Sequence, residues 1–318
     1  MAATSRLVPG AVVCAALIGQ LTGQQRADIR VDVGLVTVAC SVMDRGGAPV
    51  KNLRSGDFIL RDNGKEQLVE HFWQESDLPL TFGLIVDVSG SQTAFVESHR
   101  QTVARFLSQV MSPQDRAFLV TVAGDVKLVT DLTGSVDELQ RGVERIGRGR
   151  AGQQFGEPCF GGCGGTALWN GVYAAARQKM RWVRARRKAL IVLSDGLDTG
   201  SLHTLDDAIE SAQEAETVVY AIKYVDPTVA SGVSRASARR NRGLERLTDK
   251  TGGYTFPDPQ DRLPQVFARI EDHLRSLYLL GFTPPEDARD GRFHKLEVKV
   301  ARKDLAIHAR DGYYAQSR

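Results

Sequence analysis

The chain lacks a strong excess of charge of either sign. Its net charge of +3 at pH 7 is small for 318 residues and gives no reason to expect nucleic acid as a partner. The basic run RWVRARRK at 181–188 falls where a helix is expected to end, a position that favours cations, so we interpret it as solvated surface. With 42% apolar and 25% charged residues, the composition is that of an ordinary globular protein, and the length predicts about two domains.

Long hydrophobic runs are also scarce. One apolar stretch of roughly 15 residues follows Arg6, which is short for a membrane span. Small and polar residues come next, so we predict a signal peptide over residues 1–25 with cleavage near Gly23. An uncleaved amphiphilic tail is the alternative. No later segment is long and apolar enough to cross a bilayer, so we expect an exported protein, periplasmic or extracellular, without a stable membrane span after cleavage.

Cysteine and histidine are too few to indicate a zinc site. Cys14 lies in the predicted signal peptide and follows Val13, which does not suit lipidation, and Cys40 lies in a strand pattern where a buried thiol is expected. Cys159 and Cys163 form CFGGC and could make a disulfide in an oxidising compartment. A zinc pair would need further ligands, and the six histidines show no zinc spacing. We favour the disulfide, and free thiols remain open.

The pattern of apolar residues divides the chain into three parts. Residues 26–78 read as a β module, with a hairpin signal at Asn63-Gly64. Residues 79–275 alternate between buried strands and helices, which predicts an α/β domain with a doubly wound, mostly parallel sheet and helices on both faces. Residues 276–318 return to strand patterns. Each flank is short for an independent core, so we expect the two to pair into one β-sandwich around the inserted α/β domain. Two unrelated β appendages are the alternative.

Oxygen-bearing side chains gather where strands of the α/β region end. The three stretches are DVSGS at 87–91, GGT at 164–166 and LSDGLD at 193–198. In open α/β sheets, ligands bind at this edge. The candidate metal ligands are Asp87, Ser89, Ser91, Thr166 and Asp195. A set of oxygen ligands suits Mg²⁺, Mn²⁺ or Ca²⁺ rather than zinc or copper. Each stretch alone could instead be a helix cap.

The charge of this set indicates a role for the ion. Two aspartates only neutralise a divalent cation, and neutral hydroxyls supply most of the other contacts. Mg²⁺ prefers six ligands, so one position would stay open. An Asp or Glu carboxylate from a partner protein would fit there.

The order of these three motifs within an alternating α/β region resembles the von Willebrand factor A domain with its metal-ion-dependent adhesion site, over roughly 79–275. The flanks also resemble an exported bacterial family related to that domain. The resemblance implies that Ser89 and Ser91 bind metal directly and that Asp87 acts through water. Thr166 would match the second loop and Asp195 the third. The cysteine pair before Thr166 departs from the pattern. Asp198 reads as a helix cap or a residue outside the ligand set.

The sequence therefore favours a non-enzymatic adhesion or protein-interaction module. A structural scaffold of the envelope, in which metal only stabilises the loops, is the second reading. A metal-assisted hydrolase is the third, because a bound cation can activate water. Against an enzyme, the sequence has no Gly-x-Ser-x-Gly elbow and no histidine with a recognisable partner.

Overall fold

The computed structural model describes residues 34–74, 79–148, 152–157, 165–185, 187–223, 242–256 and 263–315. Gly34–Arg318 forms one compact unit. The predicted signal peptide and the predicted Cys159–Cys163 disulfide lie outside the described residues. Among the helices that the structure describes, none has the length and apolar character needed to cross a membrane.

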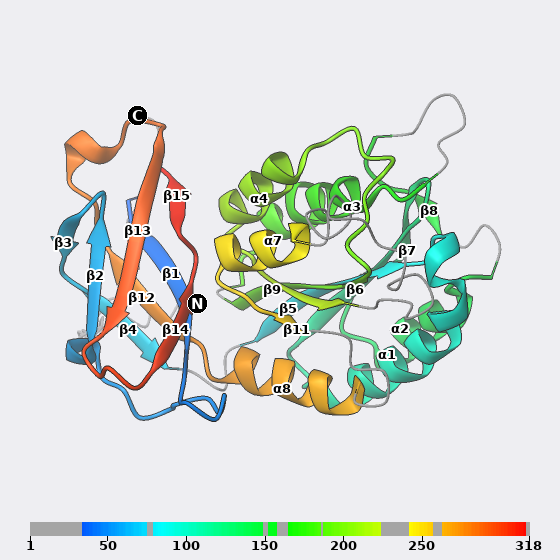
Figure 1. The fold of residues 1–318 in the computed structure, drawn as a ribbon, viewed down its shortest axis with the longest axis horizontal. Helices are drawn as coiled ribbons and strands as arrows, with labels where there is room; N and C mark the ends of the chain where they lie inside the picture. The colour runs from blue at the N-terminus through cyan, green and yellow to red at the C-terminus, as the bar shows by residue number, and fades with distance from the viewer. Residues whose placement is uncertain are drawn as a thin grey trace, which may run out of the picture. The chain divides into compact units, whose positions relative to one another are not determined.

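A seven-stranded sheet forms the centre of the α/β domain (Figure 1). Its strand order is β11-β10-β9-β5-β6-β7-β8. All pairs from β11 to β6 are parallel, whereas β7 pairs antiparallel with β6 and β8 antiparallel with β7. The mostly parallel sheet predicted from the sequence is therefore confirmed. The strands are β5 (Leu80–Asp87), β6 (Arg116–Val122), β7 (Val126–Thr133), β8 (Gln153–Gln154), β9 (Arg187–Ser194), β10 (Val218–Lys223) and β11 (Thr255–Phe256).

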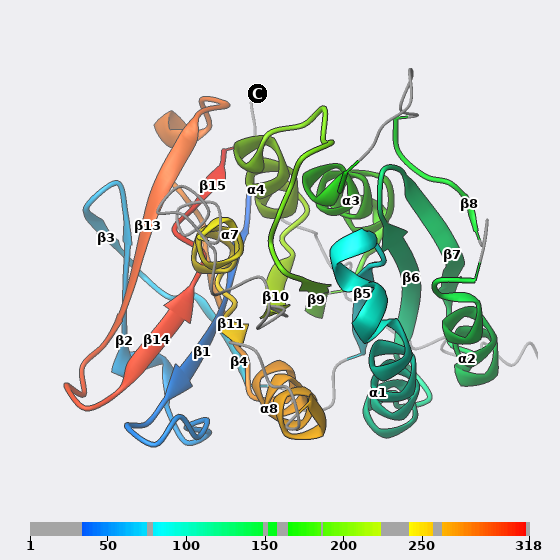
Figure 2. The same ribbon diagram turned by 45° about the vertical axis from the view of Figure 1, so that its right-hand side comes forward.

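Helices cover both faces of this sheet, as Figures 1 and 2 show. Successive residues of a strand point to opposite faces, so Leu84 packs with one helical layer and Ile85 with the other. The first layer contains α1 (Val96–Val110), α2 (Val136–Arg145) and α8 (Leu263–Arg275). The second contains α3 (Leu168–Ala174), α4 (Leu205–Glu214) and α7 (Gly243–Thr251). A 3-10 turn (Gly90–Phe95) precedes α1, and α3 continues through a π turn (Ala175–Lys179) and a 3-10 turn (Met180–Trp182).

Local sequence signals set several helix ends. The Ser135 hydroxyl accepts a hydrogen bond from the Glu138 amide and caps α2, at the position where the sequence has a capping box. Thr204 and Asp207 form a complete capping box at the start of α4, in which the side chain of each accepts a hydrogen bond from the backbone amide of the other. α7 ends at Gly252, whose φ of 86° lies in the left-handed region that favours glycine.

Strands from both ends of the described chain build a β-sandwich. One sheet has the order β14-β1-β12-β4 and the other β15-β13-β2-β3. β1 pairs with β12 with Val38 opposite Leu280, and β2 pairs with β13. The strands are β1 (Val36–Met43), β2 (Phe58–Asp62), β3 (Lys65–Gln67), β4 (His71–Gln74), β12 (Tyr278–Phe282), β13 (Phe293–Val300), β14 (Ala306–Ala309) and β15 (Gly312–Tyr314), with short 3-10 turns at Ser55–Asp57 and Glu286–Ala288.

The two sheets share one hydrophobic core, because Val38 and Leu280 of the first lie in the same buried cluster as Leu60 and Leu296 of the second. Cys40 is buried in this cluster, as the strand pattern predicted. Asn63 and Gly64 have φ values of 47° and 82° and connect β2 to β3, so the hairpin at this dipeptide is confirmed.

The pairing of the two chain ends makes a testable prediction. We expect truncation after Arg275 to unfold residues 34–74, because β12 lies between β1 and β4 and β13 pairs with β2. Hydrogen exchange of the amides in β1 and β2 measures this, with exchange in β5 and β9 as the control for the α/β domain. Protected amides in β1 and β2 of the truncated protein would show that the N-terminal module folds alone.

Candidate metal centre

Three loops meet at the carboxyl edge of the central sheet. β5 ends at Asp87, and its parallel neighbour β9 ends at Ser194, directly before Asp195. Thr166 precedes α3, which begins at Leu168. Because β5 and β9 pair with Val86 opposite Leu193, their ends bring the first and third loops together.

Asp87 is fully buried and held by hydrogen bonds from both loops. Its Oδ1 accepts from the Ser89 amide at 2.9 Å, and its Oδ2 accepts from the Ser194 hydroxyl at 2.6 Å. Burial raises the pKa of the Asp87 carboxyl to about 6, an effect that the hydrogen bonds from Ser194 and Ser89 oppose and the nearby Asp195 charge reinforces. A buried carboxylate kept in place by neutral donors is a group that a cation would stabilise.

Asp195 contacts the first loop through Gln92. The Gln92 side-chain amide donates to Asp195 Oδ2 at 3.2 Å, and the Leu197 amide donates to Oδ1 at 2.9 Å. Gln92 is fully buried, and none of the described residues is a hydrogen-bond partner for its Oε1. This carbonyl oxygen accepts no hydrogen bond from the described residues. Oxygen atoms of this kind are ligands that a hard cation prefers, so the site suits such a cation.

The second loop is attached to the third by its backbone. Thr166 O accepts hydrogen bonds from the amides of Thr199 and Gly200, both at 3.0 Å, and the Thr166 amide donates to the Thr199 hydroxyl at 3.1 Å. Gly165 has a φ of 102°, and a Cβ there would lie 2.1 Å from Thr199 Oγ1, so the close approach of these loops requires glycine.

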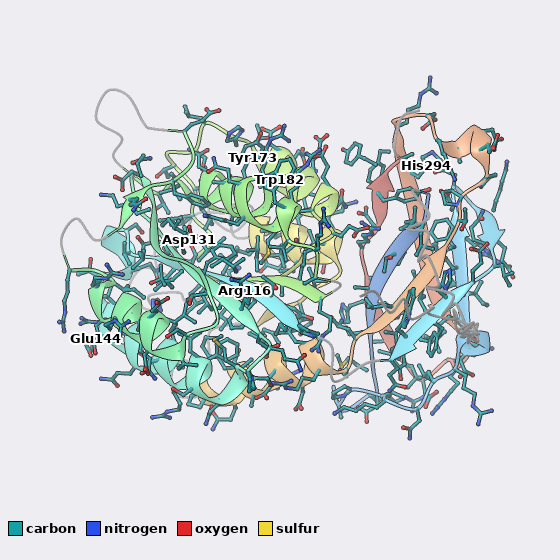
Figure 3. The ribbon with its side chains drawn as sticks, turned by 180° about the vertical axis from the view of Figure 1, so that it is seen from behind. Arg116, Asp131, Glu144, Tyr173, Trp182 and His294 are labelled. Atoms are coloured by element: carbon teal, nitrogen blue, oxygen red, sulfur yellow. The ribbon has the colours of Figure 1, made fainter. Side chains whose placement is uncertain are left out.

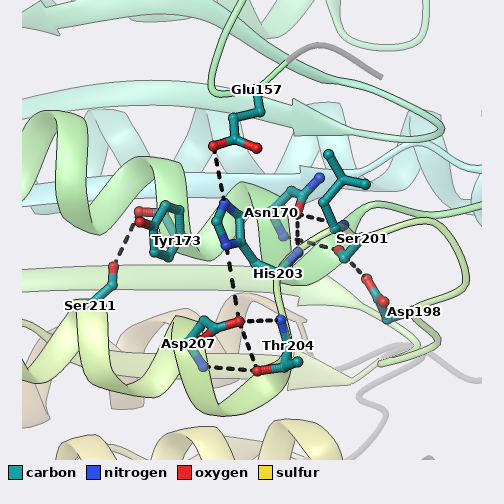
Figure 4. A network of polar contacts seen from close by, with 10 residues as sticks. Glu157, Asn170, Tyr173, Asp198, Ser201, His203, Thr204, Asp207 and Ser211 are labelled. Carbon is teal, nitrogen blue, oxygen red and sulfur yellow. Dashed lines mark hydrogen bonds and ion pairs between the residues drawn. The ribbon is translucent and has the colours of Figure 1, made fainter. Parts of the chain in front are cut away.

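Asp198 caps α3. Its Oδ1 accepts a hydrogen bond from the Trp169 amide at 3.2 Å. It also accepts one from the Ser201 hydroxyl at 2.5 Å (Figure 4). Asn170 Oδ1 in turn accepts from the amides of Leu202 and His203. These contacts tie the start of α3 to the 198–203 loop, and they agree with the interpretation of Asp198 as a helix cap.

The structure thus brings Asp87 and Asp195 together, with Ser89 beside Asp87, and joins Thr166 to the loop that follows Asp195. The Ser91 side chain lies outside the described residues. Within the described ranges, no three His, Cys, Asp or Glu side chains form a metal-holding cluster. The predicted set has only two carboxylates, and hydroxyls make up the rest.

Sequence reasoning missed Gln92, Ser194 and Thr199. Ser194 lies inside the motif LSDGLD, at the end of β9, and Gln92 directly follows the motif DVSGS. Their polarity next to buried strands was the available signal. Their partners depend on the register between β5 and β9, which the motifs alone do not contain.

The strand order, the helices on both faces and the three loops at one sheet edge are the features that the resemblance predicted. The fold of the α/β domain is von Willebrand factor A-like. No model of a protein family matches the chain, and no curated protein matches it.

Solved structures with a similar fold include three of different origin. The conserved hypothetical protein BatB from Bacteroides thetaiotaomicron has 16% identity and a TM-score of 0.45, over 62% of this chain and 100% of that one. The vWF domain of the type V pili tip protein Mfa5 from Porphyromonas gingivalis has 15% identity and a TM-score of 0.44, over 61% of this chain and 94% of that one. Proximal thread matrix protein 1 from the mussel byssus, with a zinc-occupied MIDAS motif, has 13% identity and a TM-score of 0.48, over 67% of this chain and 50% of that one. These similarities concern the fold.

Proposed function

We propose that this protein is a non-enzymatic, exported interaction module that binds an Asp or Glu carboxylate of a partner protein through a divalent cation. The observation that supports this most is the pair Asp87 and Asp195, held close together at the sheet edge by Ser194 and Gln92. Two like charges brought together in a buried place are costly unless a cation joins them.

The residues present fit Mg²⁺, Mn²⁺ or Ca²⁺. Asp87, Asp195 and the hydroxyls of Ser89, Ser91 and Thr166 would hold the ion. All are oxygen ligands. The buried Oε1 of Gln92, which has no hydrogen-bond partner in the described part of the chain, adds another next to Asp195. When bound, the ion would supply an electrophilic position for a partner carboxylate.

The chain's own residues prepare this site. Ser194 and the Ser89 amide orient the Asp87 carboxylate, and Gln92 and the Leu197 amide orient Asp195. Thr199 and Gly200 fix the backbone of Thr166. Because the loops are tied before an ion arrives, little ordering remains to oppose binding of the ion or of the partner.

Selection from a displayed peptide library in Mg²⁺, with elution by chelator, tests the proposal. We expect the recovered peptides to share an Asp or Glu, and replacement of that residue by Asn or Gln to abolish binding. Asp195→Ala should lose the peptides, since it removes one of two ionic ligands. Asp304→Ala, the same change in an exposed loop of the sandwich, should bind them as the wild type does.

Two outcomes would contradict the proposal. Peptide binding that survives both chelator and Asp195→Ala would show that the metal takes no part. A large thermal stabilisation by Mg²⁺ together with no carboxylate-dependent peptide would favour the scaffold, in which the ion only stabilises the loops.

A further inference from the structure

An exposed tryptophan lies in a basic segment at the other edge of the sheet. Trp182 is 76% exposed and ends the helical segment that starts with α3 (Figure 3 labels it). Residues 177–188 contain seven Lys or Arg and no Asp or Glu. Arg187 and Lys188 of this segment are buried, whereas Arg177, Arg181 and Arg184 are exposed.

The topology separates this segment from the candidate metal centre. Trp182 comes five residues before β9 begins at Arg187, and Asp195 directly follows the end of β9. A strand of this length spans about 26 Å. The tryptophan and the metal ligands therefore lie at opposite ends of the strands. A partner that binds at one end leaves the other end accessible.

Local carboxylates neutralise only part of the positive charge. Arg177 and Arg181 share Glu214, at 3.5 and 2.6 Å, and Lys179 pairs with Asp131 at 2.7 Å. Two guanidinium groups on one carboxylate leave an unbalanced positive charge. The exposed Arg184, two residues after Trp182 in the chain, adds another. The patch around Trp182 is thus both cationic and aromatic.

We propose that the surface made by Trp182, Arg177, Lys179, Arg181 and Arg184 docks on an anionic lipid bilayer. Tryptophan is enriched at the headgroup level of membranes, and arginine keeps its charge in the headgroups while its stem lies against apolar groups. Anionic lipids attract basic segments, about fivefold in partitioning for each Lys or Arg near the surface. Trp182 would enter the headgroup region with the guanidinium groups around it.

The distribution of other apolar side chains favours a membrane over a protein partner. Among the described residues, the other large exposed hydrophobics are Leu68, Leu202 and Phe293. They belong to the β3–β4 turn, the loop before α4 and β13, so Trp182 has none of them as a sequence neighbour. A protein interface would place its hot spots within a larger packed apolar centre. Interfacial binding to lipid depends on buried apolar area together with attraction to anionic headgroups, and an exposed ring with nearby cations provides both.

Vesicle binding tests this inference in the full chain, with chelator present so that the metal centre takes no part. The vesicles are phosphatidylcholine alone, or phosphatidylcholine and phosphatidylglycerol in about a 7:3 ratio. We expect sedimentation with the anionic vesicles only, decreasing as salt is raised. The double variant Trp182→Ser, Arg184→Gln should weaken this partitioning about tenfold or more, since it removes the ring and one cation.

A matched control separates the patch from other surfaces. The double variant Leu68→Ser, Lys303→Gln also loses one exposed apolar residue and one exposed cation, in the sandwich, and should bind vesicles as the wild type does. The wild type and both variants keep the same N-terminal residues, so any vesicle binding by those residues is equal in all three proteins and does not affect the comparison. Circular dichroism of each variant checks folding.

The fluorescence of Trp182 provides a second readout. We expect a blue shift on anionic vesicles and quenching by lipids that carry a quencher near the headgroup, both absent in the Trp182→Ser variant. Equal binding of both double variants would overturn the proposal. So would binding to a soluble polyanion such as heparin without binding to vesicles, which would assign the patch to a different partner.

Discussion

We expect Asp87→Asn to stabilise the metal-free protein at neutral pH and to abolish its stabilisation by Mg²⁺. Asp87 is fully buried, and its pKa is raised from 3.8 to about 6. At pH 7 this difference lowers the free energy of unfolding by about 3 kcal/mol. Asparagine avoids that cost but accepts one hydrogen bond fewer than the carboxylate, a loss of about 1 kcal/mol. The expected net gain is therefore about 2 kcal/mol.

The sign of the pH dependence follows from the raised pKa. The folded state holds the Asp87 proton more tightly than the unfolded chain, so the wild type loses stability as pH rises from about 4 to above 6. The variant lacks this titration. Burial lowers the pKa values of His99 and His273 to about 4, so they titrate in the same range. Both histidines are present in both proteins and cancel in the difference between them.

Urea unfolding of the two proteins in chelator, from pH 4.5 to 8, measures this difference. With Mg²⁺ added, the wild type should gain RT ln(1 + [Mg²⁺]/Kd), about 2.7 kcal/mol at one hundred times Kd, and the variant should gain nothing over the same range. Asp206→Asn, an exposed aspartate that pairs with Arg246, is the control and should keep the Mg²⁺ response. A variant at Asp87 that is still stabilised by Mg²⁺ would remove this residue from the proposed ligand set.

The positions of Asp87 and Asp195 could be predicted because local sequence patterns are sufficient to place them. A continuous apolar run predicts a buried strand, and a polar residue at its end must lie at the sheet edge. The contact of Gln92 with Asp195 could not be predicted in this way, since it joins positions 103 residues apart through a register that side-chain packing decides.

In the β-sandwich, too, local sequence patterns predict some features and do not predict others. The dipeptide Asn63-Gly64 predicts its hairpin because few residues adopt positive φ at both positions. The pairing of β1 with β12 was inferred only from the small size of each flank. Which strands become neighbours, and which side chains are enclosed between them and the α/β domain, depends on long-range contacts that no local motif encodes.

Arg310 is the clearest case, because it follows the strand β14 in a turn and yet is only 7% exposed. Its Nη2 donates to Thr37 O of β1 at 2.7 Å, and its Nη1 donates to Gln213 O near the end of α4 at 3.3 Å. Glu216 lies 3.8 Å from the guanidinium. Burial lowers the pKa of Arg310, an effect that Glu216 opposes. One side chain thus joins the sandwich to the end of a helix in the α/β domain.

A second set of contacts surrounds this arginine. Asp311 accepts from the Gln213 side chain at 2.9 Å and pairs with Lys250, and Thr251 forms an isolated β-bridge with Arg310. Gly252 fits against the same backbone, where a Cβ would lie 2.7 Å from the Arg310 amide nitrogen. The ends of α4 and α7 therefore meet the β14–β15 turn through polar contacts that apolar packing would not replace.

We expect Arg310→Met to lower the free energy of unfolding by about 3 kcal/mol. Methionine retains most of the volume but removes two hydrogen bonds from a charged donor to the carbonyl oxygens of Thr37 and Gln213, each contributing about 1.5–3 kcal/mol, and removes the partner of Glu216. Arg310→Lys keeps the charge but has no planar fork to reach both carbonyls, so its loss should be intermediate. Arg302→Met, in an exposed loop beside Asp304, should change stability by less than about 0.5 kcal/mol. Urea unfolding followed by circular dichroism measures all three, and a loss below about 1 kcal/mol for Arg310→Met would show that water replaces the arginine at these carbonyls.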